Sequence, residues 1–287
     1  MLTSAVGVLF DGFAYGMLLF LLSVGLSVTL GMMNFVNLAH CSFAAVGGYC
    51  TVLLVTRLGW PFLAALPMAF LAGALIAVAL ERALFRRFYR ASDLDQCLVT
   101  IGIAFISIAT FAWFFTTEPQ SARPPSFLTG SFELMGRSFG VYRTFLAGFG
   151  LVVTMLLIYG VEHTRFGARV RAAVDNQRMA RGLGIDVDRA FLLTFALGAG
   201  LAGLGGGLAI QVVGLDPTFA LAYLVYVLIV VSVGGLGSIA GSFAAAVVLG
   251  ISDMAGKYYF PWLGAFLIYL VMVALLMWRP VGLFGKR

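Results

Sequence analysis

The side chains most able to hydrogen-bond a solute fall in one short stretch of an otherwise apolar sequence. The stretch is Gly31–Tyr49, GMMNFVNLAHCSFAAVGGY, and its polar members are Asn34, Asn37, His40 and Ser42. Lipid offers such groups no hydrogen-bond partner, so they must face protein or a water-filled path. The pattern predicts a membrane segment that is broken or centrally placed in a helical bundle.

No arrangement of residues points to catalysis or to a metal. His40 and His163 lie on different predicted helices, with no carboxylate or cysteine at metal-ligand spacing. A lone histidine such as His40 in an apolar helix is more often hydrogen-bonded core than a substrate contact. The cysteines are odd in number, lie in or at the ends of apolar segments, and favour small buried residues over a disulfide; they are Cys41, Cys50 and Cys97.

Two further features have a functional and a structural interpretation. Asp253 is an acid in a predicted membrane segment, a position that favours function, yet Lys257 lies one turn away and could pair with it. The glycine-rich run Gly234–Gly241, GGLGSIAG, lacks the lysine of a phosphate-binding loop and does not open a βαβ unit. We therefore interpret it as a tight turn, and expect that this chain binds no nucleotide itself.

Composition identifies the class of protein. The 287 residues are 62% hydrophobic and 10% charged, and the mean hydropathy is +1.04. Globular chains carry roughly 25% charged residues, so this is a polytopic membrane protein. In a soluble chain the net charge of +6 would suggest nucleic acid; here topology explains the basic residues better, and we expect no nucleic-acid partner.

The longest run that could not rest in lipid is the charged segment, Arg165–Asp186, RFGARVRAAVDNQRMARGLGID. Charged groups cost several kcal/mol each at the bilayer centre, so the segment must lie in water. Its composition predicts a short amphipathic helix in which Asp175 pairs with Arg171 and Arg178. Gly182 and Gly184 would end that helix. The segment could be a solvated connector or a handle that another protein grips.

The apolar spans divide the whole chain, 1–287, into one domain of eight or nine transmembrane helices. Ser92 with Asp95, or Asp93 with Gln96, has capping-box spacing before the fourth span. A polar loop over 118–143 has room for a short hairpin, and Asp186 or Asp188 caps the sixth span. Small residues recur along that span at Ala199, Gly203 and Gly207, which permits close helix packing. The expected spans are 13–30, 31–55, 61–80, 96–117, 144–162, 189–213, 219–233, 242–256 and 262–278.

Basic residues set the orientation. One side would hold thirteen of the 18: Arg82, Arg86, Arg87, Arg90, Arg165, Arg169, Arg171, Arg178, Arg181, Arg189, Arg279, Lys286 and Arg287. The other would hold Arg57, Arg123, Arg137, Arg143 and Lys257. This bias predicts that the charged segment and the C-terminus are cytoplasmic. With nine spans the N-terminus lies outside.

Five elements, in order along residues 34–285, resemble the branched-chain amino acid ABC transporter permeases. NFVNLAHCSFAAVGGY looks like the signature of their second transmembrane region, and LVTIGIAF, Leu98–Phe105, resembles their fourth-span Thr-x-Gly element. The charged segment is similar to their ATPase-contacting loop. GGLGSIAG and the terminal RPVGLFG match two further elements. The length looks more like the LivH-type subunit than the longer LivM-type subunit.

The resemblance implies an all-α permease of an ABC importer in the bacterial inner membrane, which is a transport subunit and not an enzyme. It implies four kinds of partner: a second, LivM-type permease, two ATPase subunits that supply ATP and Mg²⁺ chemistry, a periplasmic substrate-binding protein, and membrane lipid. Asn34, Asn37, His40 and Ser42 would lie near the translocation path. The coupling segment would span 163–189, with candidate contacts at Arg165, Gly167, Arg169, Arg171, Ala172, Asp175, Arg178 and Gly184.

Two departures from the family pattern bear on the substrate. Cys41 stands where relatives often have glycine, and the seventh span carries Tyr223 and Tyr226 but no lysine. Branched-chain amino acids remain the first choice, followed by other amino acids, short amides or urea. The rival outside this class is an ion-coupled secondary transporter, which would favour midplane acids and an inverted repeat. A membrane-embedded enzyme fails for want of a catalytic cluster.

Overall fold

The protein is a bundle of apolar helices with one small hairpin. The computed structural model describes residues 2–33, 35–89, 91–122, 124–134 and 137–285. The helices are α1 (Leu2–Met33), α2 (His40–Val52), α3 (Phe62–Leu80), α4 (Arg86–Phe88), α5 (Asp93–Phe115), α6 (Val141–His163), α7 (Arg165–Asp175), α8 (Gln177–Gly182), α9 (Val187–Val213), α10 (Phe219–Gly234), α11 (Ile239–Tyr259) and α12 (Gly264–Trp278). The shorter elements are η1 (Leu53–Arg57), η2 (Glu81–Phe85), η3 (Ser126–Leu128), β1 (Ser131–Leu134) and β2 (Arg137–Gly140).

Six of the described helices are long and apolar enough to cross a membrane. They are α1, α3 with the turns that follow it, α5, α6, α9 and α11, and the shorter α10 and α12 are also apolar. The protein is therefore an all-α polytopic membrane protein with a two-stranded hairpin between α5 and α6. The number of spans, eight or nine, stays a prediction, because α2 is short and lies inside the bundle.

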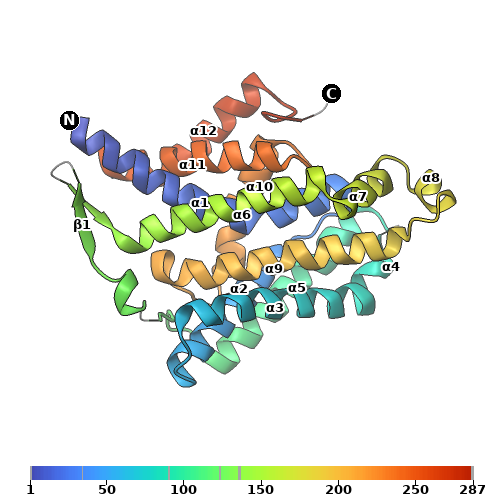
Figure 1. Ribbon diagram of the computed structural model, residues 1–287, viewed down its shortest axis with the longest axis horizontal. Coiled ribbons are helices and arrows are strands. Elements are labelled where there is room, and N and C mark those ends of the chain that lie inside the picture. The colour runs from blue at the N-terminus through green and yellow to red at the C-terminus, as the bar shows by residue number, and fades with distance from the viewer. Residues whose placement is uncertain (1, 34, 90, 123, 135–136, 286–287) are drawn as a thin grey trace.

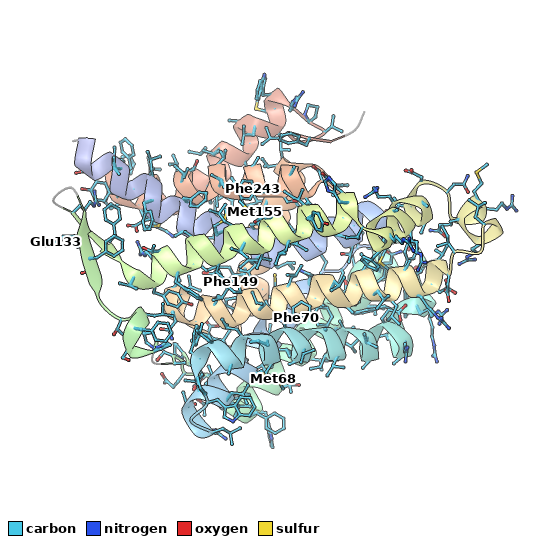
Figure 2. All side chains as sticks on the ribbon, in the orientation of Figure 1. Met68, Phe70, Glu133, Phe149, Met155 and Phe243 are labelled. Carbon is cyan, nitrogen blue, oxygen red and sulfur yellow. The ribbon has the colours of Figure 1, made fainter. Side chains whose placement is uncertain are left out.

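The centre of the bundle is built from α1, α2 and α9. α9 packs on α1, α2 and α3, while α1 also packs on α6, α10 and α11. α3, α5 and α6 cover this centre and expose much of their apolar surface. Met68 on α3 and Met155 on α6, both exposed, illustrate that outer surface (Figure 2).

The two ends of the bundle carry different elements and different ion pairs. The N-terminus and the β1–β2 hairpin lie at one end, and α4, α7 and α8 lie at the other (Figure 1). At the hairpin end Asp11 pairs with Arg143 at 2.7 Å. At the opposite end Arg86 of α4 pairs with Asp188 of α9 at 2.8 Å. The arginines after α3 and those of the charged segment therefore share one end, which agrees with the grouping used for the orientation.

Glycines allow α9 to lie directly against its neighbours. A side chain at Gly206 would overlap the backbone carbonyl of Ala44 on α2, and a Cβ at Gly203 would lie 2.6 Å from the Ala69 oxygen on α3. Small residues are needed wherever backbones approach this closely. The predicted close packing along the Ala199, Gly203 and Gly207 stripe is confirmed for Gly203.

Most helix ends follow the predicted signals. The Ser92 hydroxyl accepts from the Asp95 N–H at 3.2 Å and begins α5, and Asp186, rather than Asp188, caps α9 by accepting from the Arg189 N–H at 3.0 Å. The run Gly234–Gly241 is the predicted turn, with positive φ at Gly235 and Gly237. The 118–143 loop carries the expected hairpin, paired Ser131 to Gly140.

Two boundary predictions were wrong. The first helix begins at Leu2, not after Asp11, because Asp11 lies within α1 and pairs with Arg143. The charged segment forms two helices instead of one. Asn176 adopts an extended backbone between α7 and α8, and its side chain caps α8 by accepting from the Met179 N–H at 3.0 Å.

Candidate functional site

The backbone is unwound where the polar candidates lie. The unwound stretch, Phe35–Ala39, joins α1 to α2, and Asn34 before it lies outside the described residues. The Asn37 side-chain oxygen accepts from the Ala39 N–H at 3.1 Å, and the Asn37 carbonyl accepts from the His40 N–H at 3.3 Å. Asn37 therefore forms a side-chain turn just before α2, whose N-cap is Ala39. The predicted break in the second segment is confirmed.

The three described polar candidates are buried and contact different neighbours. The His40 Nε2 lies 3.1 Å from the Leu22 carbonyl oxygen on α1, and the Ser42 and Ser107 hydroxyls lie 2.9 Å apart across α2 and α5. Asn37, His40 and Ser42 are 0%, 1% and 4% exposed. Their side chains are therefore enclosed by the subunit, and a solute could meet them only after a neighbouring helix moves. Their role in a solute path stays a prediction.

The side chains that hold the unwound stretch come from α5. The Gln96 Oε1 accepts from the Val36 N–H at 2.9 Å, and the Thr100 hydroxyl accepts from the Leu38 N–H at 3.1 Å. We did not single out Gln96 as a site residue from the sequence, although Gln96, Thr100 and Ser107 share one face of an apolar helix. Such a polar face is the sequence signal for a buried partner that needs hydrogen bonds.

At the other candidate site, α7 packs against α6 and α9, and α8 projects beyond the bundle (Figure 1). Arg165, Arg169 and Arg178 are exposed and have no ion-pair partner within the described part of the chain. Gly167 is buried against the Val161 carbonyl, where a side chain would overlap it. Ala172 is half-buried, and Gly184 has a φ of +79°, a conformation that ends α8 and favours glycine.

The predicted pairing of Asp175 with Arg171 and Arg178 is wrong. The Arg171 guanidinium instead donates to the Val161 carbonyl and, at 3.4 Å, to the Glu162 carbonyl at the end of α6. Asp175 is exposed and makes no ion pair with any described residue. Helix C-termini leave carbonyls unsatisfied, and the Arg171 side chain supplies a donor to them. Arg171 thus fixes α7 against α6.

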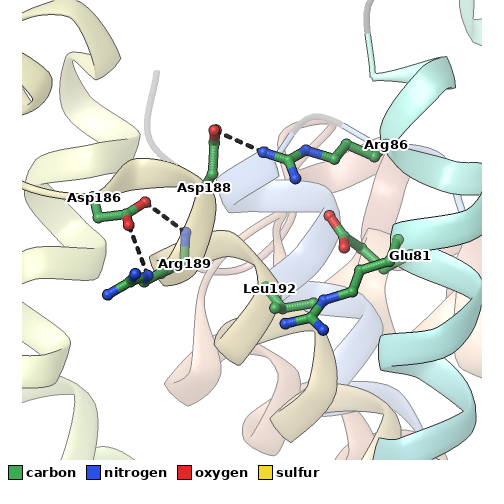
Figure 3. A pocket seen from close by; sticks show the side chains of 7 residues that line it. Glu81, Arg86, Asp186, Asp188, Arg189 and Leu192 are labelled. Carbon is green, nitrogen blue, oxygen red and sulfur yellow. Dashed lines mark hydrogen bonds and ion pairs between the residues drawn. The ribbon is translucent and has the colours of Figure 1, made fainter.

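Asp188 connects the charged segment to the bundle. It accepts from Arg86 at 2.8 Å and from Arg181 at 3.0 Å, so one carboxylate links α4, α8 and α9. Figure 3 shows the Arg86 contact and the neighbouring Asp186–Arg189 pair. These groups line an open cavity of about 330 Å³ with Glu81, Arg82 and Leu192.

In the wall of this cavity Glu81 is 3% exposed and accepts from the Tyr89 hydroxyl at 3.1 Å. Burial, followed by the Glu81 carboxylate, raises the pKa of Tyr89. Because a tyrosine is already neutral at physiological pH, the raised pKa keeps its hydroxyl a donor under alkaline conditions as well. Tyr89 therefore anchors α4 to the turn that precedes it.

Two apolar side chains of the charged segment are exposed. Met179 is 70% exposed and Leu183 is 79% exposed, next to the exposed Arg178. Methionine is enriched in the cores of protein interfaces, so this pair is a candidate contact surface. We did not select either residue from the sequence, because apolar residues in a short amphipathic helix are expected to face the bundle.

The charged pair at the opposite end of the bundle is structural. The Lys257 ammonium lies 2.6 Å from the Asp253 carboxylate, whose side chain is 1% exposed, and lies 5.5 Å from the centre of the Tyr15 ring. The expected pairing of Asp253 with Lys257 is confirmed.

Comparison with known proteins identifies the family. The family model for the branched-chain amino acid transport system permease component matches residues 8–276. A probable branched-chain amino acid transport permease protein LivH of Methanocaldococcus jannaschii is 29% identical over 94% of this chain and 90% of its own length. LivH of Escherichia coli K12 is 25% identical over 97% of this chain and 94% of its own.

A longer relative matches as well. LivM of Escherichia coli K12 is 26% identical over 93% of this chain but only 68% of its own length. No solved structure matches the chain. The broken second segment, the glycine-packed helices and the family match over nearly the whole length agree, and the chain belongs to the branched-chain amino acid transport permease family.

Proposed function

We propose that this chain is the permease subunit of an ABC importer that moves amino acids, branched-chain amino acids first among them, across the bacterial cytoplasmic membrane. The observation that carries the proposal is the family match over residues 8–276. The relatives it resembles are named for high-affinity branched-chain amino acid transport. Short amides and urea rank after other amino acids as solutes.

The proposed assembly contains this chain and a second, LivM-type permease, because relatives named LivH and LivM both match it. Two ATPase subunits would bind ATP and Mg²⁺ and carry out hydrolysis. A periplasmic binding protein would deliver the solute. This chain itself would form part of the passage and receive the mechanical input.

That input would enter at the coupling segment, residues 163–189. Arg165, Arg169 and Arg178 are exposed there, and Met179 and Leu183 add apolar surface. Arg171 and Gly167 would act indirectly by holding α7 against α6. Movement of α8 would pass to the bundle through the Arg181–Asp188–Arg86 contacts as rigid-body motion of helices.

Reconstitution tests the proposal. The chain is placed in proteoliposomes with its cognate second permease, ATPases and binding protein, and uptake of labelled leucine, isoleucine, valine, urea and acetamide is measured with ATP or with an ion gradient alone. ATP-dependent uptake of a branched-chain amino acid is expected. Uptake driven by an ion gradient without ATP would contradict the proposal and favour a secondary transporter.

A further inference from the structure

We propose that Gln96 and Thr100 of α5 are positioning residues that clamp the unwound stretch, Phe35–Ala39, and thereby fix where Asn37, His40 and Ser42 stand. The clamp itself rests on geometry alone. Its consequence for transport rests on the proposed function.

The backbone N–H groups of Val36, Leu38 and Ala39 in the unwound stretch have acceptors among the described residues. In apolar surroundings each buried N–H needs an acceptor, and leaving one unmatched costs the full desolvation of the group. Val36 and Leu38 donate to Gln96 and Thr100, while Ala39 donates to the Asn37 side chain. The Val36 and Leu38 N–H groups of this stretch are thus both met by side chains of α5.

The Gln96 amide and the Thr100 hydroxyl are each held in place by further hydrogen bonds. The Gln96 Nε2 donates to the Phe88 and Ala91 carbonyls at 3.2 and 3.3 Å, so its amide oxygen has to face the Val36 N–H. The Thr100 hydroxyl donates to the Gln96 carbonyl at 2.7 Å, which leaves its lone pairs for the Leu38 N–H. Gln96 is 2% exposed and Thr100 is 0% exposed. Water therefore cannot replace either acceptor.

Hydrogen bonds, an ion pair and ring contacts link Gln96 and the unwound stretch to the end of the bundle that holds α7 and α8. Gln96 is bonded to the α4–α5 turn, and α4 carries Arg86, which pairs with Asp188. The Phe35 ring packs on Phe85 at 5.4 Å and on Tyr89 at 5.2 Å between ring centres. The unwound stretch, α4 and the first turns of α5 are therefore one bonded unit. A displacement of α8 that moves this unit would also move the polar group on α2, because coupling travels through such packed and bonded chains.

Hydrogen–deuterium exchange of the assembled complex in nanodiscs tests the clamp. Thr100→Val keeps the shape of the side chain and removes the acceptor, Thr100→Ser restores it, and Gln96→Met removes the other acceptor. The matched control is Thr110→Val on the same helix, because among the described residues the Thr110 hydroxyl bonds the Ile106 carbonyl of α5 itself and no other group. The readout is the exchange rate of the peptide that contains Val36 and Leu38.

We expect exchange about tenfold faster in Thr100→Val and in Gln96→Met, the size of effect that follows from losing one buried hydrogen bond. Thr100→Ser and Thr110→Val should exchange like the wild type. Unchanged exchange in both Thr100→Val and Gln96→Met, or an equal acceleration in Thr110→Val, would overturn the clamp.

Transport separates the clamp from the proposed function. In the reconstituted importer, Thr100→Val should lower the maximal uptake rate severalfold and leave the half-saturating solute concentration unchanged, with recovery in Thr100→Ser. Equal uptake rates in Thr100→Val and the wild type would overturn the positioning role in transport. A wild-type complex without ATP-driven uptake would instead contradict the proposed function, and the exchange result would still decide the clamp.

Discussion

Asp188 is exposed, yet its carboxylate joins two helices through ion pairs. Its side chain is 54% exposed, so each of its two ion pairs contributes only about 0.2–1 kcal/mol to stability. It is nevertheless the carboxylate that joins Arg181 of α8 to Arg86 of α4. We expect Asp188 to fix the position of α8 relative to α4 rather than to add much stability.

Asp188→Asn should therefore change coupling more than stability. We expect the melting temperature of the purified complex to fall by no more than a few degrees, and the amount of solute moved per ATP hydrolysed to fall severalfold. The control is Asp175→Asn, which removes an exposed carboxylate of the same segment that has no ion-pair partner among the described residues. Similar coupling ratios in the two variants would contradict the role of Asp188.

The Asp253–Lys257 pair differs because one partner is buried. Asp253 is 1% exposed at its side chain while Lys257 is 53% exposed. Removing one member of a fully buried pair leaves an uncompensated charge and costs about 3–5 kcal/mol, and the cost here should be smaller because Lys257 is half-exposed. Lys257→Met should lower the melting temperature of the subunit in detergent, and Asp253→Asn added to it should recover most of the loss. Equal melting of Lys257→Met and the wild type would contradict this account.

At the scale of elements, the position of α9 depends on the glycines that let it approach α2 and α3. A Cβ added at Gly206 would lie 3.0 Å from the Ala44 Cα and overlap its carbonyl. Overpacking of this kind costs about 1–3 kcal/mol. Gly206→Ala should thus reduce the yield of folded subunit, measured by size-exclusion chromatography in detergent.

Gly148→Ala on α6 is the matched control, because no described atom outside its own helix and chain neighbours lies within 4 Å of a Cβ built there. Alanine is favoured over glycine in a helix interior by about 0.5–1 kcal/mol, so this variant should fold as well as the wild type. Equal folding of both variants would mean that α9 can move away from α2 without loss.

The elements that the sequence predicted well are those with local signals. Ser92 and Asp186 begin their helices through their own side chains, and the Gly234–Gly241 turn needs positive φ at Gly235 and Gly237. Partners distant in sequence were not predictable in the same way. Val36 and Gln96 are sixty positions apart, and only the fold brings the amide to that backbone.

At the scale of the whole molecule, the candidate sites were predicted as regions but not as contacts. The broken segment and the charged segment both lie where the sequence placed them. The burial of Asn37 and His40, the bond from Arg171 to α6 and the exposure of Met179 and Leu183 depend on how helices pack around each segment. Hydropathy finds where a chain leaves lipid, but it does not identify which side of a short helix faces its own bundle.

The molecule as a whole places buried polar residues at its centre and an exposed charged segment at one end. α4, α5 and Asp188 connect the two through bonded side chains. Such an arrangement suits a permease subunit in which binding of a partner protein at one end moves the helices around the buried polar residues. The central claim is therefore that a partner engages α8 and that this engagement drives transport.

The measurement that tests this claim most directly is uptake and ATP hydrolysis recorded together in proteoliposomes that hold the complete importer, with Arg178→Ala, Met179→Ser and Leu183→Ser combined in α8 and the turn that follows it. These side chains are exposed, so the subunit should keep its melting temperature. The account predicts that the solute moved per ATP hydrolysed falls at least about tenfold, the equivalent of about 1.4 kcal/mol of lost coupling. A ratio equal to that of the wild type, in a complex that remains assembled, would contradict it.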